Sequence, residues 1–222
     1  MLRIGLYGVG GLYNFGCEAI IRGTIRYIRF RYGENVKIIY YSKNYKYDSN
    51  ILNGENIEIV DIGRKVTTIE KVIGKSVEIL NIKYIPFKRK EYITVIDNSD
   101  IIFSVGGDLY TIHEHLASHK KYRFMNNLVE FGKLAIKRNK ELYIFGASIG
   151  PFGNYNRAID YFKKHLEKVN GIFCREYGTI KYLNSLGIHE NVFFCPDPSF
   201  LVDARYKSNA NNNHTIGINF SP

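Results

Sequence analysis

Two charged side chains directly follow segments that are predicted to be strands, and both are of residue types that serve in catalysis or in binding. Asp108 follows two glycines in SVGGDLY (104–110), and Arg175 follows the apolar run GIFC (171–174). A carboxylate in such a place can accept a proton from a sugar hydroxyl, and an arginine can hold a carboxylate or phosphate through two hydrogen bonds. Asp108 and Arg175 are therefore our candidate catalytic residues. Each has a structural alternative: Asp108 can cap the following turn, and Arg175 can form a buried pair with Glu176.

Glycines at two strand ends would let the backbone approach a ligand closely. Gly106 and Gly107 directly precede Asp108, and Gly150 follows Ser148 in a second motif, SIGP. The Ser148 hydroxyl can donate a hydrogen bond to an anionic oxygen. We therefore expect both turns to bind substrate. Gly106 and Gly107 contribute from the first turn, and Ser148 and Gly150 from the second.

A third glycine-rich turn, GLYGVGGLYNFGCEA (5–19), lies near the start of the chain. Gly10 and Gly11 stand between an apolar run and a helical pattern, as in loops that bind phosphate at a helix N-terminus. The spacing departs from the dinucleotide fingerprint GxGxxG, because Tyr13 occupies the position of the last glycine. We expect Gly10 and Gly11 to bind substrate, but not a dinucleotide.

Polar side chains follow that turn. About half a dozen residues, LYNFGC, separate the glycines from the expected helix, which favours a wider pocket for something other than a pyrophosphate. Asn14 and Glu18 are the polar groups there and are candidate substrate contacts. The structural alternative is that Asn14 holds backbone amides of the turn while Glu18 offsets the helix dipole.

Two other groups are expected to have no chemical role. Asp197 lies between two prolines in CPDPSFLVD (195–203), which restricts it to holding a loop. His115 and His119 have the spacing of two metal ligands on a helix, but Ala117 breaks the HExxH order and no third ligand is evident. We therefore expect no metal site.

Composition indicates a globular protein of the cytoplasm. The chain has 222 residues, is 45% hydrophobic, and contains neither a run of 18 apolar residues nor a signal sequence. Its three cysteines, Cys17, Cys174 and Cys195, are far apart and odd in number, which argues against a disulfide framework and a zinc knuckle. We expect them to be reduced.

The net charge of +10 is spread along the chain, with concentrations at 88–90, 120–123 and 137–140. No recognition motif for nucleic acid accompanies it, so we expect no nucleic-acid partner. Solvated helix faces on a lysine-rich chain are the favoured explanation. An anionic substrate, or peripheral association with the negatively charged inner face of a membrane, explains the charge as well.

Apolar runs and helical periodicity alternate along the chain. Strands are predicted at Leu2–Tyr7, Val36–Tyr41, Ile57–Val60, Ile101–Val105, Leu142–Gly146, Gly171–Cys174 and Val192–Cys195. Helices are predicted at about Cys17–Arg31, Tyr122–Arg138, Ala158–Val169 and Tyr177–Leu186, and a helical pattern also falls between Lys65 and Tyr92. This alternation predicts an α/β fold, a Rossmann-like parallel sheet with helices on both faces. All the motifs would then lie at one edge of the sheet, where such folds bind ligands.

The domain organisation is predicted from a change in composition. Residues 1–203 form the Rossmann-like N-terminal domain, and the polar, low-complexity segment 204–214 is a linker. Residues 215–222 resemble the first strand of a second domain. We therefore expect the chain to stop just inside that domain and to supply one wall of an interdomain cleft.

Five motifs in order resemble those of the polysaccharide pyruvyl transferase family. They are NFGCE (14–18), GGD (106–108), SIGP (148–151), Arg175 after a strand, and DPSF (197–200). The resemblance covers about the whole chain, and the order of five motifs is more specific than any one of them.

The resemblance implies a fold similar to the B-type glycosyltransferases, of which this chain would be the N-terminal half. It implies transfer of pyruvate from phosphoenolpyruvate to a sugar hydroxyl as a ketal, with release of phosphate, during synthesis of cell-surface polysaccharide. No cofactor is implied; the partners are phosphoenolpyruvate and a carbohydrate or lipid-linked saccharide, and a homo-oligomer stays open. Arg175 would bind the donor, while Asp108, Asn14, Glu18 and Ser148 would line the cleft. The family's proton donor, a histidine of the second domain, would lie beyond Pro222.

Two other classes of function stay open. The chain can be a non-catalytic module that binds sugars or anions, or a glycosyltransferase that uses a nucleotide sugar. Release of phosphate from phosphoenolpyruvate, and binding of a nucleotide diphosphate sugar, would separate the three.

Overall fold

The fold is built on one parallel sheet. The computed structural model describes residues 1–63, 89–118 and 123–203. The seven strands have the order β3-β2-β1-β4-β5-β6-β7, and their bounds are β1 Leu2–Tyr7, β2 Val36–Ser42, β3 Glu58–Asp61, β4 Ile101–Val105, β5 Glu141–Ala147, β6 Gly171–Cys174 and β7 Val192–Phe194. Every neighbouring pair is parallel. The predicted α/β class and Rossmann-like sheet are confirmed.

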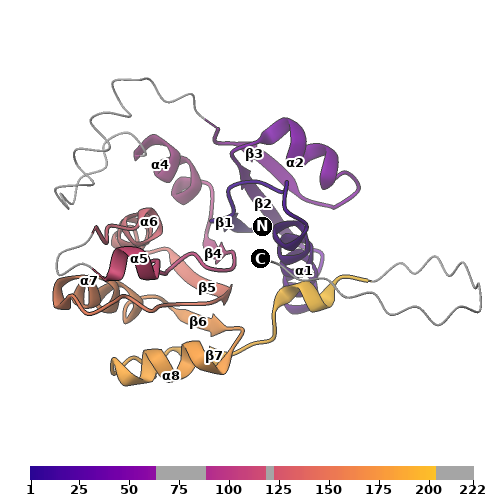
Figure 1. The fold of residues 1–222 in the computed structure, drawn as a ribbon. Coiled ribbons are helices and arrows are strands. Elements are labelled where there is room, and N and C mark those ends of the chain that lie inside the picture. Colours follow the sequence, from indigo (N-terminus) through magenta and orange to yellow (C-terminus); the bar gives the residue numbers. More distant parts are fainter. Residues whose placement is uncertain (64–88, 119–122, 204–222) are drawn as a thin grey trace, which may run out of the picture.

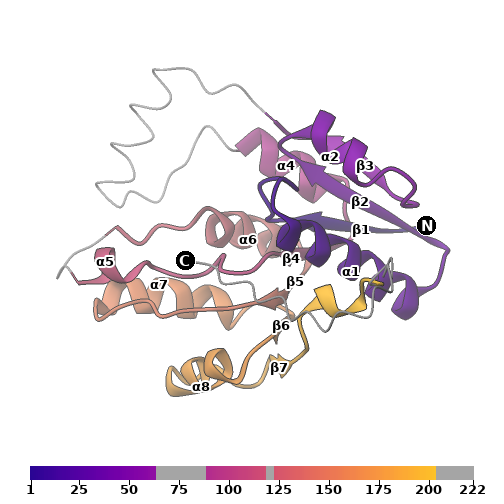
Figure 2. The ribbon, with the colours of Figure 1, turned by 45° about the vertical axis from the view of Figure 1, so that its right-hand side comes forward.

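Helices connect the strands and cover both faces of the sheet (Figure 1). They are α1 Phe15–Tyr32, α2 Tyr45–Ile51, α4 Arg89–Asp97, α5 Glu114–Ala117, α6 Asn127–Lys137, α7 Asn156–Leu166, α8 Tyr177–Ser185 and the short 3-10 helix η2 Pro198–Leu201. Helix α1 lies on one side, whereas α4, α6 and α7 lie on the other, as the turned view also shows (Figure 2).

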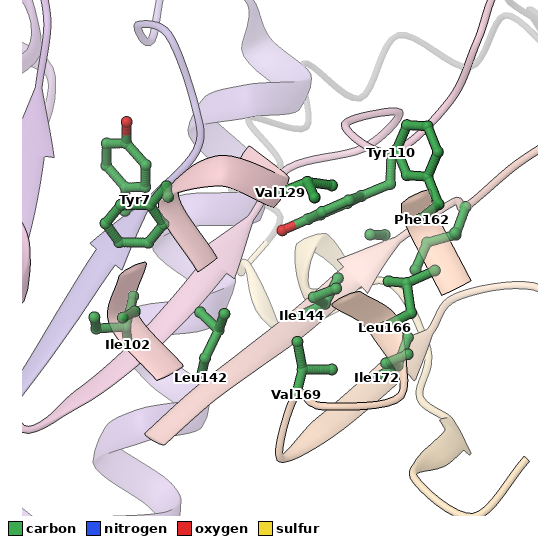
Figure 3. Close-up of a cluster of buried hydrophobic side chains, with 14 of the residues drawn as sticks. Tyr7, Ile102, Tyr110, Val129, Leu142, Ile144, Phe162, Leu166, Val169 and Ile172 are labelled. Carbon is green, nitrogen blue, oxygen red and sulfur yellow. The ribbon is translucent and has the colours of Figure 1, made fainter. Parts of the chain in front are cut away.

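Two hydrophobic cores follow from this layering, because successive side chains of a strand point to opposite faces. On the central strand β4, Ile101, Phe103 and Val105 join the core beneath α1, and Ile102 joins the core on the opposite face. All five residues of β4 are buried, as expected for a strand that is covered on both sides. Figure 3 shows part of the second core, including Tyr7, Ile102, Tyr110, Val129, Leu142, Ile144, Phe162, Leu166, Val169 and Ile172.

The strand order reverses between β1 and β4, which are hydrogen-bonded neighbours at the centre of the sheet. The loops after β1 and β4 therefore leave the sheet in different directions at their carboxyl ends, and open α/β sheets bind ligands beside such a point. The loops after β5, β6 and β7 leave from the same edge, because all seven strands are parallel. The expectation that the motifs share one edge of the sheet is thus confirmed.

Two predicted helix starts were wrong because the N-caps of these helices, Asn14 and Asn126, stand at other positions than we expected. Helix α1 begins at Phe15, earlier than the predicted Cys17, since the Asn14 side chain accepts a hydrogen bond from Gly16 N at 2.7 Å. The turn after β1 is therefore shorter than we expected. Helix α6 begins at Asn127, later than the predicted Tyr122, because Asn126 caps it in the same way.

Three helices were not predicted: α2, α4 and α5. Helix α4 begins at Arg89, near the end of the segment 65–92 in which a helical pattern was noted, and continues to Asp97. Most of that pattern lies outside the described residues. So do residues 119–122, the predicted linker at 204–214 and the predicted strand after it.

Candidate functional site

The guanidinium group of Arg175, at the carboxyl end of β6, binds three side chains from three different loops. Its Nε donates to Ser148 Oγ at 3.0 Å, Nη1 to Asp197 Oδ2 at 3.0 Å, and Nη2 to Asp108 Oδ1 at 3.1 Å. These partners follow β5, β7 and β4 respectively. The parallel sheet therefore brings the predicted residues Asp108, Ser148 and Arg175 together.

The expected alternative for Arg175, a buried pair with its neighbour Glu176, does not form. The Glu176 carboxylate accepts a hydrogen bond from the Thr179 hydroxyl at 2.9 Å, in the first turn of α8. That hydroxyl also accepts a hydrogen bond from Ile149 N at 3.2 Å. Glu176 therefore helps to hold the loop after β5 and leaves the guanidinium group to the other three partners.

The three partners of Arg175 differ in exposure. Ser148 is buried, and the Asp197 side chain is 19% exposed, whereas the Asp108 side chain is 70% exposed. An exposed ion pair contributes little to stability, since water and salt screen it. Ser148 and Asp197 are thus the fixed supports of the guanidinium group, and Asp108 is the partner that solvent or a ligand can replace.

The loops after β4 and β5 are joined by backbone hydrogen bonds, which fixes the site on rigid elements. Ser148 N donates to Gly107 O at 3.0 Å, and Gly150 N donates to Tyr110 O at 2.9 Å. Gly107 is also close to the guanidinium group: a Cβ at this position would lie 3.3 Å from Arg175 Nη2. A side chain there would press on the guanidinium group, which favours glycine at this position.

A cavity of about 940 Å³ opens beside the guanidinium group. Four predicted residues line it, namely Asp108, Ser148, Gly150 and Arg175. Sequence reasoning missed several other polar residues of its wall, among them Thr111, His113, Glu114, Ser118 and Asn154. Ligand pockets of proteins have volumes of roughly 300 to 1,000 Å³, so the cavity has room for a sugar beside a small anion.

Other predicted residues lie away from this wall. Gly106 directly follows β4, and Gly10 and Gly11 lie in the turn after β1. The Asn14 side chain caps α1. The Glu18 side chain, in the first turn of α1, accepts a hydrogen bond from Arg22 Nε at 2.8 Å. Asn14 thus makes the backbone contact that its structural alternative predicted. Glu18 lies in the first turn of α1, as its alternative expected, but its contact with Arg22 was not predicted.

A buried carboxylate that we did not predict holds the turn after β1. Asp48, on α2, is fully buried and accepts hydrogen bonds from Leu12 N at 2.9 Å, from Ser42 Oγ at 2.5 Å and from the Tyr40 hydroxyl at 3.2 Å. Burial, together with this carboxylate, raises the pKa of Tyr40, which keeps its hydroxyl a donor. The residue stands in a polar segment, KYDSN, that carries no apolar periodicity to indicate a helix.

The DPSF motif folds back across α1. Pro198 packs where two glycines make room: a Cβ at Gly23 would overlap the Pro198 carbonyl oxygen, and a Cβ at Gly146 would lie 2.5 Å from the proline ring. Arg26 of α1 forms an ion pair with Asp203 at 3.0 Å. Helix η2 is therefore clamped onto α1 and the end of β5.

In the described part of the chain, the histidines and cysteines form no metal-binding group. Among the described residues no three His, Cys, Asp or Glu side chains group to hold a metal ion, and His119 lies outside these residues. Burial, reinforced by Glu176, raises the pKa of Cys174 to about 12, so this thiol beside Arg175 is neutral. Within the same described part of the chain, no helix has the length and apolar character needed to cross a membrane.

A family model described as Polysaccharide pyruvyl transferase matches residues 14–221. A search of curated proteins found no match.

Several solved structures are similar in part. A putative UDP-N-acetylglucosamine 2-epimerase from Listeria monocytogenes is 14% identical, with a TM-score of 0.46 over 86% of this chain and 44% of that one. An S. aureus MnaA–UDP co-structure is 14% identical, with a TM-score of 0.48 over 94% of this chain and 49% of that one. The lipopolysaccharide outer core galactosyltransferase WaaB is 12% identical, with a TM-score of 0.42 over 86% of this chain and 44% of that one. The chain spans less than half the length of these three structures.

Proposed function

The chain belongs to the polysaccharide pyruvyl transferase family, and we propose that it takes part in transfer of pyruvate from phosphoenolpyruvate to a sugar hydroxyl, forming a ketal. The observation that carries the proposal is the guanidinium group of Arg175, oriented by Ser148 and Asp197 at the wall of a large cavity. Phosphoenolpyruvate is a small anion with a carboxylate and a phosphate, the two groups that arginine binds best.

The net reaction defines what the site must do. The methylene carbon of phosphoenolpyruvate gains a proton, two sugar oxygens bond to the central carbon, and the bond from that carbon to the phosphate oxygen breaks. The two sugar hydroxyls lose their protons. One proton goes to the methylene carbon, and the other goes to the released phosphate. A cation that binds the donor's phosphate stabilises the charge that develops as this group leaves.

Asp108 is the proposed base for the acceptor. Its carboxylate is exposed and lines the cavity together with Arg175, to which it is bonded at 3.1 Å. When a donor anion takes over the guanidinium group, Asp108 becomes free to accept a proton from a sugar hydroxyl. The proton for the methylene carbon is assigned to no described residue, in keeping with a histidine of a further domain, as the family resemblance implies.

Binding of phosphoenolpyruvate to the 222-residue chain tests the proposal. Arg175→Ala should weaken binding by about 2 kcal/mol, or roughly thirtyfold in Kd, since an anion loses a charged hydrogen-bond donor. Arg157→Ala is the matched control, because it removes the same charge from an exposed position outside the cavity wall. Isothermal titration calorimetry would measure all three proteins.

Equal Kd values for Arg175→Ala and the unaltered chain would refute the role of the arginine. Tight binding of a nucleotide diphosphate sugar, with no binding of phosphoenolpyruvate, would favour a glycosyltransferase instead. Binding of phosphoenolpyruvate by a full-length protein that releases no phosphate with a sugar acceptor would favour a non-catalytic module.

A further inference from the structure

We propose that Asp197 is a positioning residue that holds the Arg175 guanidinium group in its anion-binding orientation; this rests on the proposed function of Arg175. The two carboxylate oxygens of Asp197 have different partners. Oδ1 accepts a hydrogen bond from Ser199 N at 2.9 Å, which caps η2, and Oδ2 accepts one from Arg175 Nη1 at 3.0 Å. One side chain thus joins a backbone anchor to the guanidinium group.

The platform that carries Asp197 is rigid. The next residue, Pro198, is buried and packs against α1 and β5 at the two glycines, Gly23 and Gly146, whose lack of a Cβ makes room for it. At the last residue of η2, the Leu201 carbonyl accepts a hydrogen bond from Arg26 of α1 at 2.5 Å. The backbone that carries the carboxylate is therefore held on its C-terminal side by contacts that do not involve the guanidinium group.

The hydrogen bonds to Ser148 and Asp197 leave other N–H groups of Arg175 available to a ligand. Ser148 and Asp197 hold Nε and Nη1, which fixes the plane of the group. Of its five N–H groups, three are used, and two have no partner among the described residues. The third bond, to the exposed Asp108, is the one that an anion can replace.

Judged by its charge alone, a carboxylate at position 197 should weaken the binding of an anion. Asp197 lies beside the proposed anion site and repels a donor, so Coulomb's law predicts that its removal tightens anion binding. Positioning predicts the opposite, because a guanidinium group without its support samples orientations that do not match the anion. The sign of the effect therefore separates the two explanations.

The test compares Asp197→Ser with Asp108→Asn in the 222-residue chain. Serine is a good N-cap and keeps the acceptor for Ser199 N, but its hydroxyl is a bond shorter and loses Arg175. Asp108→Asn removes the same negative charge at nearly the same distance from the guanidinium group, 3.1 against 3.0 Å, at the exposed position. Phosphoenolpyruvate is the probe, titrated by calorimetry.

We expect Asp197→Ser to weaken binding of phosphoenolpyruvate by about tenfold, comparable with the loss of a side chain that orients a metal ligand. Asp108→Asn should bind a few times more tightly than the unaltered chain, because it removes a charged group that competes with the anion for Arg175. Thermal unfolding checks that η2 stays docked: the midpoint for Asp197→Ser should remain within about 5 °C. Unchanged or tighter binding by Asp197→Ser, with a midpoint in that range, would overturn the proposal.

A second readout does not depend on phosphoenolpyruvate. The Arg175 side-chain Nε–Hε signal in a ¹⁵N NMR spectrum, identified by its absence in Arg175→Lys, reports the order of the guanidinium group. It should be sharp in the unaltered chain and in Asp108→Asn, and broadened in Asp197→Ser. If no protein binds phosphoenolpyruvate, the proposed function fails, while a signal that stays sharp in Asp197→Ser would refute the positioning role.

Discussion

His165, on α7, provides a built-in sensitivity of the fold to acid. Its side chain is buried, and neither ring nitrogen has a hydrogen-bond partner among the described residues. The ring stacks on Tyr110 at 6.2 Å and lies against Gly132 of α6, where a Cβ would overlap it. Burial, and secondarily the charge of Lys133, lowers the pKa of His165 from 6.5 to about 3.

The sign and size of the effect follow from proton linkage. A histidine whose pKa is lower in the folded state binds its proton more readily when unfolded, so stability is complete above about pH 6.5 and is lost as the pH falls toward 3. One pKa unit corresponds to about 1.4 kcal/mol, so between pH 7 and pH 5 His165 should remove about 2 kcal/mol from the free energy of unfolding.

Replacement of His165 by leucine should abolish this contribution, since leucine has a similar volume and no proton to bind. Urea unfolding of both proteins at pH 7 and pH 5 measures it. The unaltered chain should lose about 2 kcal/mol more than His165→Leu over this interval. Equal losses in the two proteins would show that the buried ring does not couple folding to protonation, and the reasoning would fail.

Two further substitutions test the packing around the site. Gly23→Ala should destabilise the chain by about 2 kcal/mol in urea unfolding, because overlap with Pro198 outweighs the gain of about 1 kcal/mol in helix propensity; Gly178→Ala, in α8, has open space for its Cβ and should stabilise instead. A stabilising Gly23→Ala would contradict the clamp. Asp48→Ala should cost about 3 kcal/mol, since it leaves Leu12 N and two hydroxyls without their acceptor; a loss below about 1 kcal/mol would mean that water replaces the carboxylate.

The strands were predictable because their apolar runs are bounded by polar residues or glycine. Leu2–Tyr7, Ile101–Val105 and Gly171–Cys174 were predicted with the bounds that the structure shows. Helices without an apolar stripe were not: Tyr45–Ile51 has the polar sequence YKYDSNI, and its position depends on Asp48, whose partners lie elsewhere in the chain. Local sequence patterns do not indicate contacts between residues that are far apart in the chain.

The candidate site was predictable to the extent that it depends on the sheet. Parallel strands place their carboxyl ends together, so Asp108, Ser148 and Arg175 were expected to meet, and they do. The role of Asp197 was only half predicted. Its two prolines indicate a loop, and it does cap η2, but its bond to Arg175 depends on the return of the chain over α1, which no spacing in the sequence encodes.

The clamp of η2 on α1 also bears on the order in which the protein assembles during synthesis. Arg26 and Leu201 are 175 positions apart, and such long-range contacts form late because the intervening chain must first be brought together. A nascent chain that has emerged as far as Phe194 already contains all seven strands. It still lacks Asp197, whose carboxylate accepts a hydrogen bond from Arg175, so the arrangement that we propose for anion binding would form only with the last few residues before Asp203.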